Sequence, residues 1–390
     1  MKLELKPINT FTYNMPRSGI RRIMDNATDR DILHLEVGQP NFPTPPHIIQ
    51  AACEASTDGQ GRYTRYTPNM GYPSLREAIA EKLKRENGIN ASIHNILVTP
   101  GATYGIAISL SVLLNRGDEV LIPDPGYVNF SMLVPQYGGV VLRYPTLESQ
   151  GFMPNIDTIT KRITPRTKAI VVNSPSNPTG AVCTEEFIRD LVDIAQGNNL
   201  YILSDETYEH IIFEGKHISP GRFDTDGRVV SLFSFSKSYA MTGWRVGYVV
   251  ASDTIARVLE KQQEFYSSCA PSVSQKAAEV ALRDTDRCIK EMVEAYRGSR
   301  DLVIDILRKH GLFSYRPRGA FYILINVTST GMNSDVFADR LLEEQRVAVA
   351  PGATFGEIGG RYIRVCMAVS EEVLREGVER ICSFIESHRR

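Results

Sequence analysis

The stretch SFSKSYAMTGWRVGY, residues 234–248, begins where the hydrophobic run RVVSLF ends. Open α/β sheets bind their ligands at such strand ends. Lys237 has a hydroxyl three residues before it, at Ser234, and a guanidinium eight residues after it, at Arg245. Alone, a strand-end lysine is most simply explained as part of a solvated turn. Because a planar guanidinium and a hydroxyl together suit a phosphate dianion, this stretch predicts an amine beside a bound phosphate, as an imine-forming aldehyde cofactor requires.

The run before Lys237 is one of seven short runs rich in β-branched residues between about residue 95 and residue 252. The others are NILVTP, DEVLIP, GVVLRYP, KAIVVNSP, LYILSDE and GYVVAS. Amphipathic helical patterns at 104–114, 126–137 and 185–196 separate several of them. Strands separated by helices of this length predict right-handed crossovers and a mostly parallel, seven-stranded sheet flanked by helices.

The pattern changes after about residue 252. Long helical patterns at 254–266, 273–282 and 286–310 precede the strand-like runs YILINV, VAVAPG and YIRVCMA, and a final helix begins near residue 371. This order predicts a smaller α+β domain. We expect the early segment ILHLEVGQPNFPTPP to dock on it, which gives a large α/β domain at 45–280 and a small discontinuous domain at 1–44 and 281–390.

Composition limits the classes of function. The chain has 390 residues, 42% of them hydrophobic and 23% charged, and a formal net charge of −1. Such a charge provides no field that attracts nucleic acid or an anionic membrane. The six cysteines lack a CxxC pair or a Cys/His cluster at metal spacing, so we expect reduced thiols and no metal. With no long apolar run and no N-terminal apolar segment, we expect a cytoplasmic protein.

Polar or small residues follow several of the predicted strands. Gly101 follows NILVT and opens a helical pattern, so its turn offers backbone N–H groups to an anion, or is a plain βα turn. Asp205 follows LYIL, where a carboxylate is otherwise an N-cap or part of a surface turn. Tyr127 follows DEVLIP, and an aromatic residue there, taken alone, is more simply explained as part of the core. Arg364 lies within YIRVCMA and must point outward or find a partner.

Taken in order, these motifs resemble one known family. The stretch at 234–248 is similar to the lysine motif of fold-type I pyridoxal-phosphate (PLP) enzymes, specifically the class I/II aminotransferases. The likeness runs from GQPNFPTP through the NPTG turn at 177–180 to YIRVCMA. The resemblance implies the fold of a fold-type I PLP-dependent transferase, with PLP held as a Schiff base on Lys237.

The resemblance also implies roles for individual residues. Gly101, Ala102 and Thr103 cradle the phosphate of PLP, with Ser234 and Arg245. Asp205 keeps the ring nitrogen protonated, and the remaining cofactor contacts are Tyr127 on the ring and Asn177 and Tyr208 on O3′. The substrate α-carboxylate is bound by Arg364 with Gly38 and Asn177, and Tyr66 reaches the partner's PLP phosphate across a homodimer.

The implied function is a ping-pong transfer of an amino group from an L-amino acid to a 2-oxo acid, with Lys237 moving the proton. By family habit, 2-oxoglutarate is the expected acceptor. The nearest alternative is a PLP-dependent carbon–sulfur lyase or decarboxylase on the same fold. A regulator with an aminotransferase-like domain, or a binding protein without activity, is disfavoured, because motif spacing leaves no room for a helix-turn-helix and Lys237, Asp205, Asn177 and Arg364 are intact.

Overall fold

A seven-stranded sheet forms the centre of the computed structural model, which describes residues 6–283 and 286–390. Its strand order is β2-β8-β7-β6-β5-β3-β4. β8 runs antiparallel to both of its neighbours, and the other pairs are parallel. This confirms the predicted mostly parallel sheet, whose strands are β2 (Ile96–Thr99), β3 (Glu119–Asp124), β4 (Val140–Pro145), β5 (Thr167–Asn173), β6 (Tyr201–Asp205), β7 (Val229–Ser234) and β8 (Gly247–Val250).

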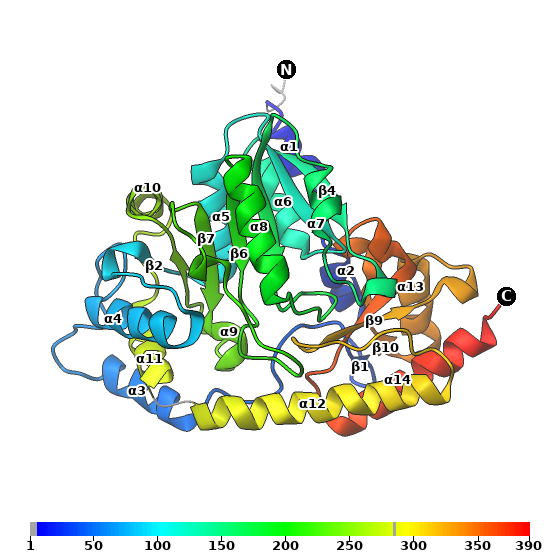
Figure 1. The fold of residues 1–390 in the computed structure, drawn as a ribbon. Coiled ribbons are helices and arrows are strands. Elements are labelled where there is room, and N and C mark those ends of the chain that lie inside the picture. The colour runs from blue at the N-terminus through cyan, green and yellow to red at the C-terminus, as the bar shows by residue number, and fades with distance from the viewer. Residues whose placement is uncertain (1–5, 284–285) are drawn as a thin grey trace, which may run out of the picture.

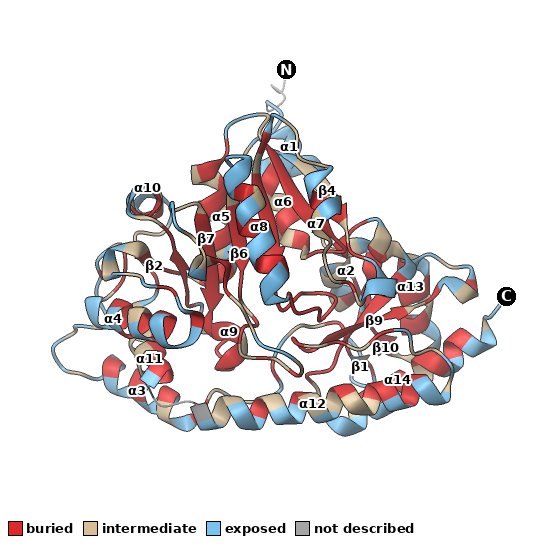
Figure 2. Ribbon diagram, viewed as in Figure 1, coloured by how far each residue is buried: buried red, intermediate tan, exposed pale blue. Residues whose placement is uncertain are grey.

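Both faces of this sheet are covered, and its strands are almost wholly buried except for the edge strand β4, which is mostly half-buried (Figure 2). Neighbouring residues of a strand point to opposite faces. Leu121 packs in one core with helices of one face, whereas Val120 and Ile122 pack in another core on the opposite face. One face carries α5 (Ala102–Leu113), α6 (Val128–Gln136) and α10 (Asp253–Tyr266), and the other carries α7 (Ile156–Thr160) and α8 (Glu185–Gly197).

A third core covers the sheet near β2 and β8. Apolar residues of three helices pack there against Ile96, Phe233 and Tyr248. α4 continues directly into a π-helical turn, Leu83–Asn87, that ends at Gly88. The helices are α3 (Pro46–Ser56), α4 (Pro73–Lys82) and α11 (Ser272–Arg283), and the short α9 (Phe235–Ser238) directly follows β7.

The C-terminal part forms a smaller antiparallel sheet of order β11-β12-β9, as the α+β prediction required. β1 (Leu33–His34) pairs in parallel with β10 (Val347–Ala348), which confirms that the early segment docks on this part. The elements are β9 (Tyr322–Asn326), β11 (Ala350–Pro351) and β12 (Tyr362–Cys366), covered by α12 (Asp286–Lys309), α13 (Ser334–Gln345) and α14 (Glu371–Ser387).

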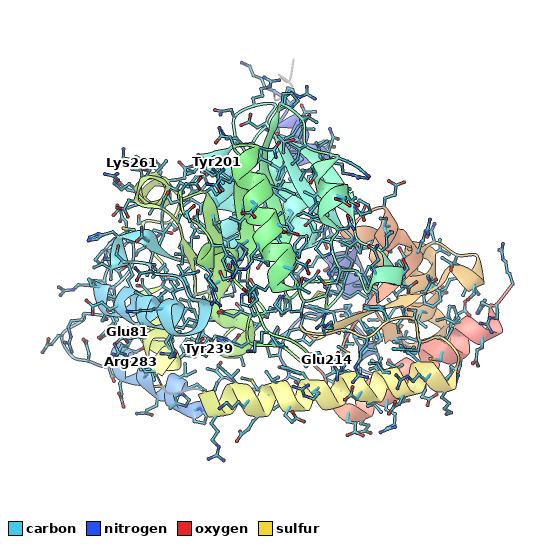
Figure 3. The ribbon with its side chains drawn as sticks, viewed as in Figure 1. Glu81, Tyr201, Glu214, Tyr239, Lys261 and Arg283 are labelled. Carbon is cyan, nitrogen blue, oxygen red and sulfur yellow. The ribbon has the colours of Figure 1, made fainter. Side chains whose placement is uncertain are left out.

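Helix α12 links the two sides of the molecule, running along the bottom of the view in Figure 1 from α3 and α11 to α14. Glu214, labelled above α12 in Figure 3, accepts a hydrogen bond from Arg300 of this helix at 3.0 Å. The domain division at 45–280 against 1–44 and 281–390 stays a prediction, and residues 1–5 and 284–285 lie outside the described part of the chain. Of the described helices, none combines the length and apolar character needed to cross a membrane.

The shorter elements complete the chain. α1 (Thr10–Asn14) and α2 (Gly19–Asn26) precede β1, and Figure 1 shows α2 between the large sheet and the C-terminal part. Turns of 3₁₀ helix occupy Ile93–Asn95, Glu148–Gln150, Pro220–Arg222, Thr328–Thr330, Gly352–Phe355 and Ile358–Arg361.

A buried ion pair ties α4 to the loop that follows β6. Glu209 accepts hydrogen bonds from Lys82 and, at 2.8 Å, from Asn87 of the π-helical turn. Burial by itself raises the pKa of Glu209, but Lys82 together with His210, His217 and Asn87 outweighs it, so the pKa is lowered. Because Asp205 ends β6 four residues earlier, this pair anchors the loop that carries that carboxylate.

We predict that Glu209→Gln lowers the free energy of unfolding by about 3 kcal/mol, because the buried charge of Lys82 then keeps only its longer ion pair with Glu86, at 3.8 Å. Thermal unfolding at one fixed protein concentration measures this. The control is Glu185→Gln, which removes an exposed partner of Arg189 on α8 and leaves stability almost unchanged. Equal effects of the two substitutions would contradict the structural role of the Lys82–Glu209 pair.

Candidate active site

The carboxyl ends of the parallel strands open into a cavity of about 500 Å³. Both the large sheet and the N- and C-terminal segments contribute to its lining. Nearly all of the residues predicted from the sequence line this one cavity: Gly38, Ala102, Thr103, Tyr127, Asn177, Asp205, Tyr208, Ser234, Lys237, Arg245 and Arg364.

One end of the cavity is built for an anion. Gly101 has φ of +84°, and α5 begins at the next residue, so the positive end of this helix faces the cavity. A Cβ atom at Gly101 would overlap the guanidinium of Arg245, which therefore lies directly against the turn. Arg245 donates one hydrogen bond to the Thr242 carbonyl oxygen at 2.7 Å. Backbone N–H groups and a cation thus converge on one point, as phosphate binding requires.

Lys237 lines the cavity from a single helical turn that follows β7. Ser234 caps this turn, its Oγ accepting a hydrogen bond from the Ser236 N–H at 3.1 Å. The Lys237 amine donates to the Gly38 carbonyl oxygen at 2.5 Å, so it bridges the large sheet and the early segment. Burial lowers the pKa of Lys237 to about 8, and the positive charges of Arg364 and Arg245 act in the same direction. An amine with this pKa is a good nucleophile near neutral pH.

Asp205 supplies the one carboxylate among the described residues that line the cavity. Its Oδ1 accepts a hydrogen bond from the Thr207 N–H at 3.1 Å. Burial raises the pKa of Asp205 to about 6, and the hydrogen bonds from Thr207 and the charge of Lys237 offset this only in part. A buried carboxylate with so little compensation favours a cationic or protonated ligand group beside it.

The loop after β5 brings Asn177 into the cavity. Its bonds Ser174–Pro175 and Asn177–Pro178 are both cis. Asn173, the last residue of β5, accepts from the Asn177 N–H at 2.8 Å and donates to the Asp205 carbonyl oxygen at 3.0 Å. This asparagine, which the sequence reasoning missed, therefore fixes Asn177 relative to Asp205.

Arg364 projects from β12 into the cavity and is only 2% exposed. Its guanidinium donates to Asn177 Oδ1 at 3.0 Å and to the Glu36 carbonyl oxygen at 2.5 Å. It also lies 4.4 Å from the ring centre of Tyr322. Nε is buried and has no hydrogen-bond partner within the described residues. A buried guanidinium with an unused donor and no carboxylate partner is suited to binding an anionic ligand.

Two tyrosines form the side of the cavity between Lys237 and Arg364. The hydroxyls of Tyr208 and Tyr322 are 2.7 Å apart and share a hydrogen bond. A Cβ atom at Gly38 would overlap the Tyr322 hydroxyl, so only glycine allows this approach. Tyr127 also lines the cavity, and its hydroxyl contacts Thr103 Oγ1 at 3.4 Å and accepts a hydrogen bond from Asn129 at 3.0 Å.

Two predicted residues do not line the cavity. Gly101 lies just behind it, in contact with Arg245. Tyr66 is 88% exposed on the surface of the single chain, so its predicted role stays a prediction. Other lining residues carried little signal in the sequence, because tertiary packing brings them there: Ile20, Arg21, Met24, Val37, Gln39, Ile106, Thr207, Ser236, Thr242 and Tyr322.

The sequence is similar to a protein family and to individual proteins of known activity. Residues 30–381 match the family model for aminotransferases of class I and II. The chain is 38% identical over 378 residues to the aspartate aminotransferase of Pyrococcus horikoshii, covering 96% of each chain. It is also 38% identical to aromatic-amino-acid aminotransferase 2 of Thermococcus litoralis, over 93% of this chain and 94% of the relative.

The fold agrees with solved structures as well. The structure of Thermus thermophilus aspartate aminotransferase with maleate superposes with a TM-score of 0.93 at 35% identity. The match covers 97% of this chain and 100% of that chain. The resemblance that the motifs indicated is therefore confirmed for the fold and for the family.

The pKa of Lys237 leads to a pH-dependent prediction. In protein stripped of bound carbonyl compounds, reductive alkylation of Lys237 by an aldehyde should accelerate with pH and level off above about pH 8, because the neutral amine is the nucleophile. An ordinary lysine continues to gain reactivity up to a pH of about 10.5. Peptide mass spectrometry measures the rate at Lys237, with Lys237→Ala as the control for assignment. A rate at Lys237 that still rises steeply above pH 9.5 would contradict the burial argument.

Proposed function

The chain belongs to the class I and II aminotransferase family and is an amino-acid aminotransferase, and we propose that its cavity binds PLP and catalyses ping-pong transamination through Lys237. The observation that carries the proposal is the pairing of a buried amine of lowered pKa with a buried carboxylate of raised pKa in one cavity. When bound, PLP supplies an aldehyde that combines with amines and a ring that accepts an electron pair.

The residues fit the phosphate of PLP. The proposed anchor consists of the N-terminus of α5, with Gly101, Ala102 and Thr103, together with Ser234 and Arg245. The contact that keeps the Arg245 guanidinium against Gly101 supports this role, because a side chain at Gly101 would displace it. The phosphate would neutralise the cationic end of the cavity.

Each polar atom of the pyridine ring has a candidate partner among the residues of the cavity. Asp205 is proposed to hold the ring nitrogen protonated. The positive charge of that nitrogen would in turn stabilise the buried Asp205 carboxylate, whose pKa burial raises. The side-chain carbonyl oxygen of Asn177 accepts a hydrogen bond from Arg364. The side-chain amide nitrogen of Asn177 can therefore donate to O3′. Tyr208 is proposed as the second partner of O3′, and Tyr127 as the residue that stacks on the ring.

The substrate is proposed to bind through its α-carboxylate. Arg364 would bind it bidentately, assisted by the Asn177 amide and by the backbone at Gly38. Lys237 then moves the proton from the substrate Cα, and its lowered pKa suits a general base near neutral pH. The surrounding aromatic side chains exclude water from this transfer.

The names of the relatives support part of the proposal on the two substrates. They are named for aspartate and for aromatic amino acids, and one was solved with maleate, a dicarboxylate. These names support an L-amino acid donor and 2-oxoglutarate as acceptor, rather than the lyase or decarboxylase alternative.

Assembly and location belong to the same proposal. A homodimer would cover the exposed ring of Tyr66 and bring it to the partner's PLP phosphate. We expect a cytoplasmic location, which the six free cysteines support.

The first test replaces the carboxylate under the proposed ring. Asp205→Asn should bind PLP but convert L-amino acids at least about 100-fold more slowly, because an amide does not hold the ring nitrogen protonated. The rate is followed by the absorbance of the bound PLP after mixing with each L-amino acid. Asp190→Asn, on the exposed face of α8, is the matched control. Normal rates in Asp205→Asn, or a wild type that gains no absorbance with PLP, would overturn the proposal.

The second test separates substrate binding from cofactor binding. Arg364→Lys keeps the charge but loses the planar fork, so transition-state binding of amino acids should weaken by roughly 2–4 kcal/mol. PLP content should stay unchanged, since no PLP group is proposed to contact Arg364. The control variant is Arg361→Lys, which lies on the exposed surface three residues earlier. Loss of PLP from Arg364→Lys with normal amino-acid turnover would assign this residue to the cofactor instead.

A further inference from the structure

The active-site cavity contains one cation that the protein leaves without a partner. Among the described residues, the cationic side chains that line it are Arg21, Lys237, Arg245 and Arg364. The last three each donate a hydrogen bond to an oxygen of the protein. Within residues 6–283 and 286–390, no hydrogen bond or ion pair involves the Arg21 guanidinium, which is exposed to solvent.

The structure holds the helix of Arg21 firmly beside the cavity. In α2, Ile23 is fully buried in the core of the C-terminal part. Arg22 pairs with Asp335 at 3.0 Å and with Asp339, which fixes α2 against α13. Ile20 and Met24 lie one helical turn apart, and both line the cavity next to Arg21. The position of Arg21 at the cavity is therefore determined by the packing of α2, while its own side chain remains available.

The other parts of the cavity are already used by the proposed reaction. The phosphate end is formed by α5 and Arg245, the ring position by Asp205, and the α-carboxylate position by Arg364. A substrate held between Arg364 and Lys237 must extend its side chain toward a surface that these groups do not occupy. The face of α2 with Ile20, Arg21 and Met24 is such a surface, apolar along the helix and cationic at one edge.

The contacts left open in the cavity point in the same direction. A phosphate would contact Arg245, an α-carboxylate would contact Arg364, and a protonated ring would face Asp205. Arg21 is then the cationic side chain of the described lining that has no direct partner. Guanidinium groups bind carboxylates through two parallel hydrogen bonds, which gives directional as well as electrostatic recognition.

We propose that Arg21 binds the side-chain carboxylate of a dicarboxylic substrate and so sets the preference of the enzyme for acidic over neutral side chains. This assignment rests on the proposed function of the cavity. The apolar residues Ile20 and Met24 contact the methylene groups of the same side chain, and they allow a neutral substrate to occupy the site without Arg21.

The experiment compares an acidic and a neutral donor in the PLP-loaded enzyme. Arg21→Gln should lower kcat/KM for L-glutamate roughly 10- to 100-fold, the scale of charge-assisted hydrogen bonds, and leave L-methionine nearly unchanged. Succinate, which has no amino group to transfer, should bind the variant more weakly by a similar factor, while butyrate binds wild type and variant alike. Arg21→Lys should recover part of the loss, because it restores the charge. The control is Arg17→Gln, an exposed arginine that pairs with Asp25.

Three results would overturn the assignment of Arg21: equal losses for glutamate and methionine, no loss for either, or a wild type that converts methionine but not glutamate. A protein that converts no amino acid at all would instead overturn the proposed function. Because the succinate measurement needs no turnover, it distinguishes weaker binding of the carboxylate from slower chemistry.

Discussion

The constraint on which the site depends is an excess of buried positive charge. Arg364 is buried and Lys237 is half-buried, and the described lining offers them one carboxylate, Asp205. Burial of uncompensated charge is costly, and here it appears as the lowered pKa of Lys237 and the raised pKa of Asp205. The protein reduces the cost with carbonyl oxygens at Gly38 and Glu36, which leaves the charges open to an anionic ligand.

Those two carbonyl oxygens give the early segment a function beyond docking. Residues 36–38 follow β1, which pairs with β10 of the C-terminal part, while Lys237 belongs to the large sheet. The hydrogen bond from Lys237 to Gly38 therefore joins elements that are far apart in the chain. The hydrogen bond from Arg364 to the Glu36 carbonyl oxygen likewise joins β12 to the early segment.

Much of this arrangement was predictable from the sequence because the reactive side chains come directly after the strands. Asp205 and Lys237 come directly after buried runs, and the carboxyl ends of parallel strands meet at one edge. Asn173 was missed although it is a polar residue at the end of an apolar run, which was a usable signal. Tyr322 begins an apolar strand that also fits a plain core, and its contact with Gly38 exists only in the folded protein. Tyr66 was identified by family spacing alone, and one chain does not test an interface.

The contribution of α2 shows why substrate preference is harder to predict from the sequence than the reactive side chains are. Lys237 and Asp205 are fixed by neighbours close to them in sequence, such as Ser234 and Thr207. The position of α2 depends instead on pairs between Arg22 and α13, more than three hundred residues away. Local sequence motifs constrain the catalytic groups, whereas side-chain recognition is built from distant segments that meet over the cavity. Substitutions on α2 or α13 are therefore able to alter substrate preference without touching a residue of the lysine motif.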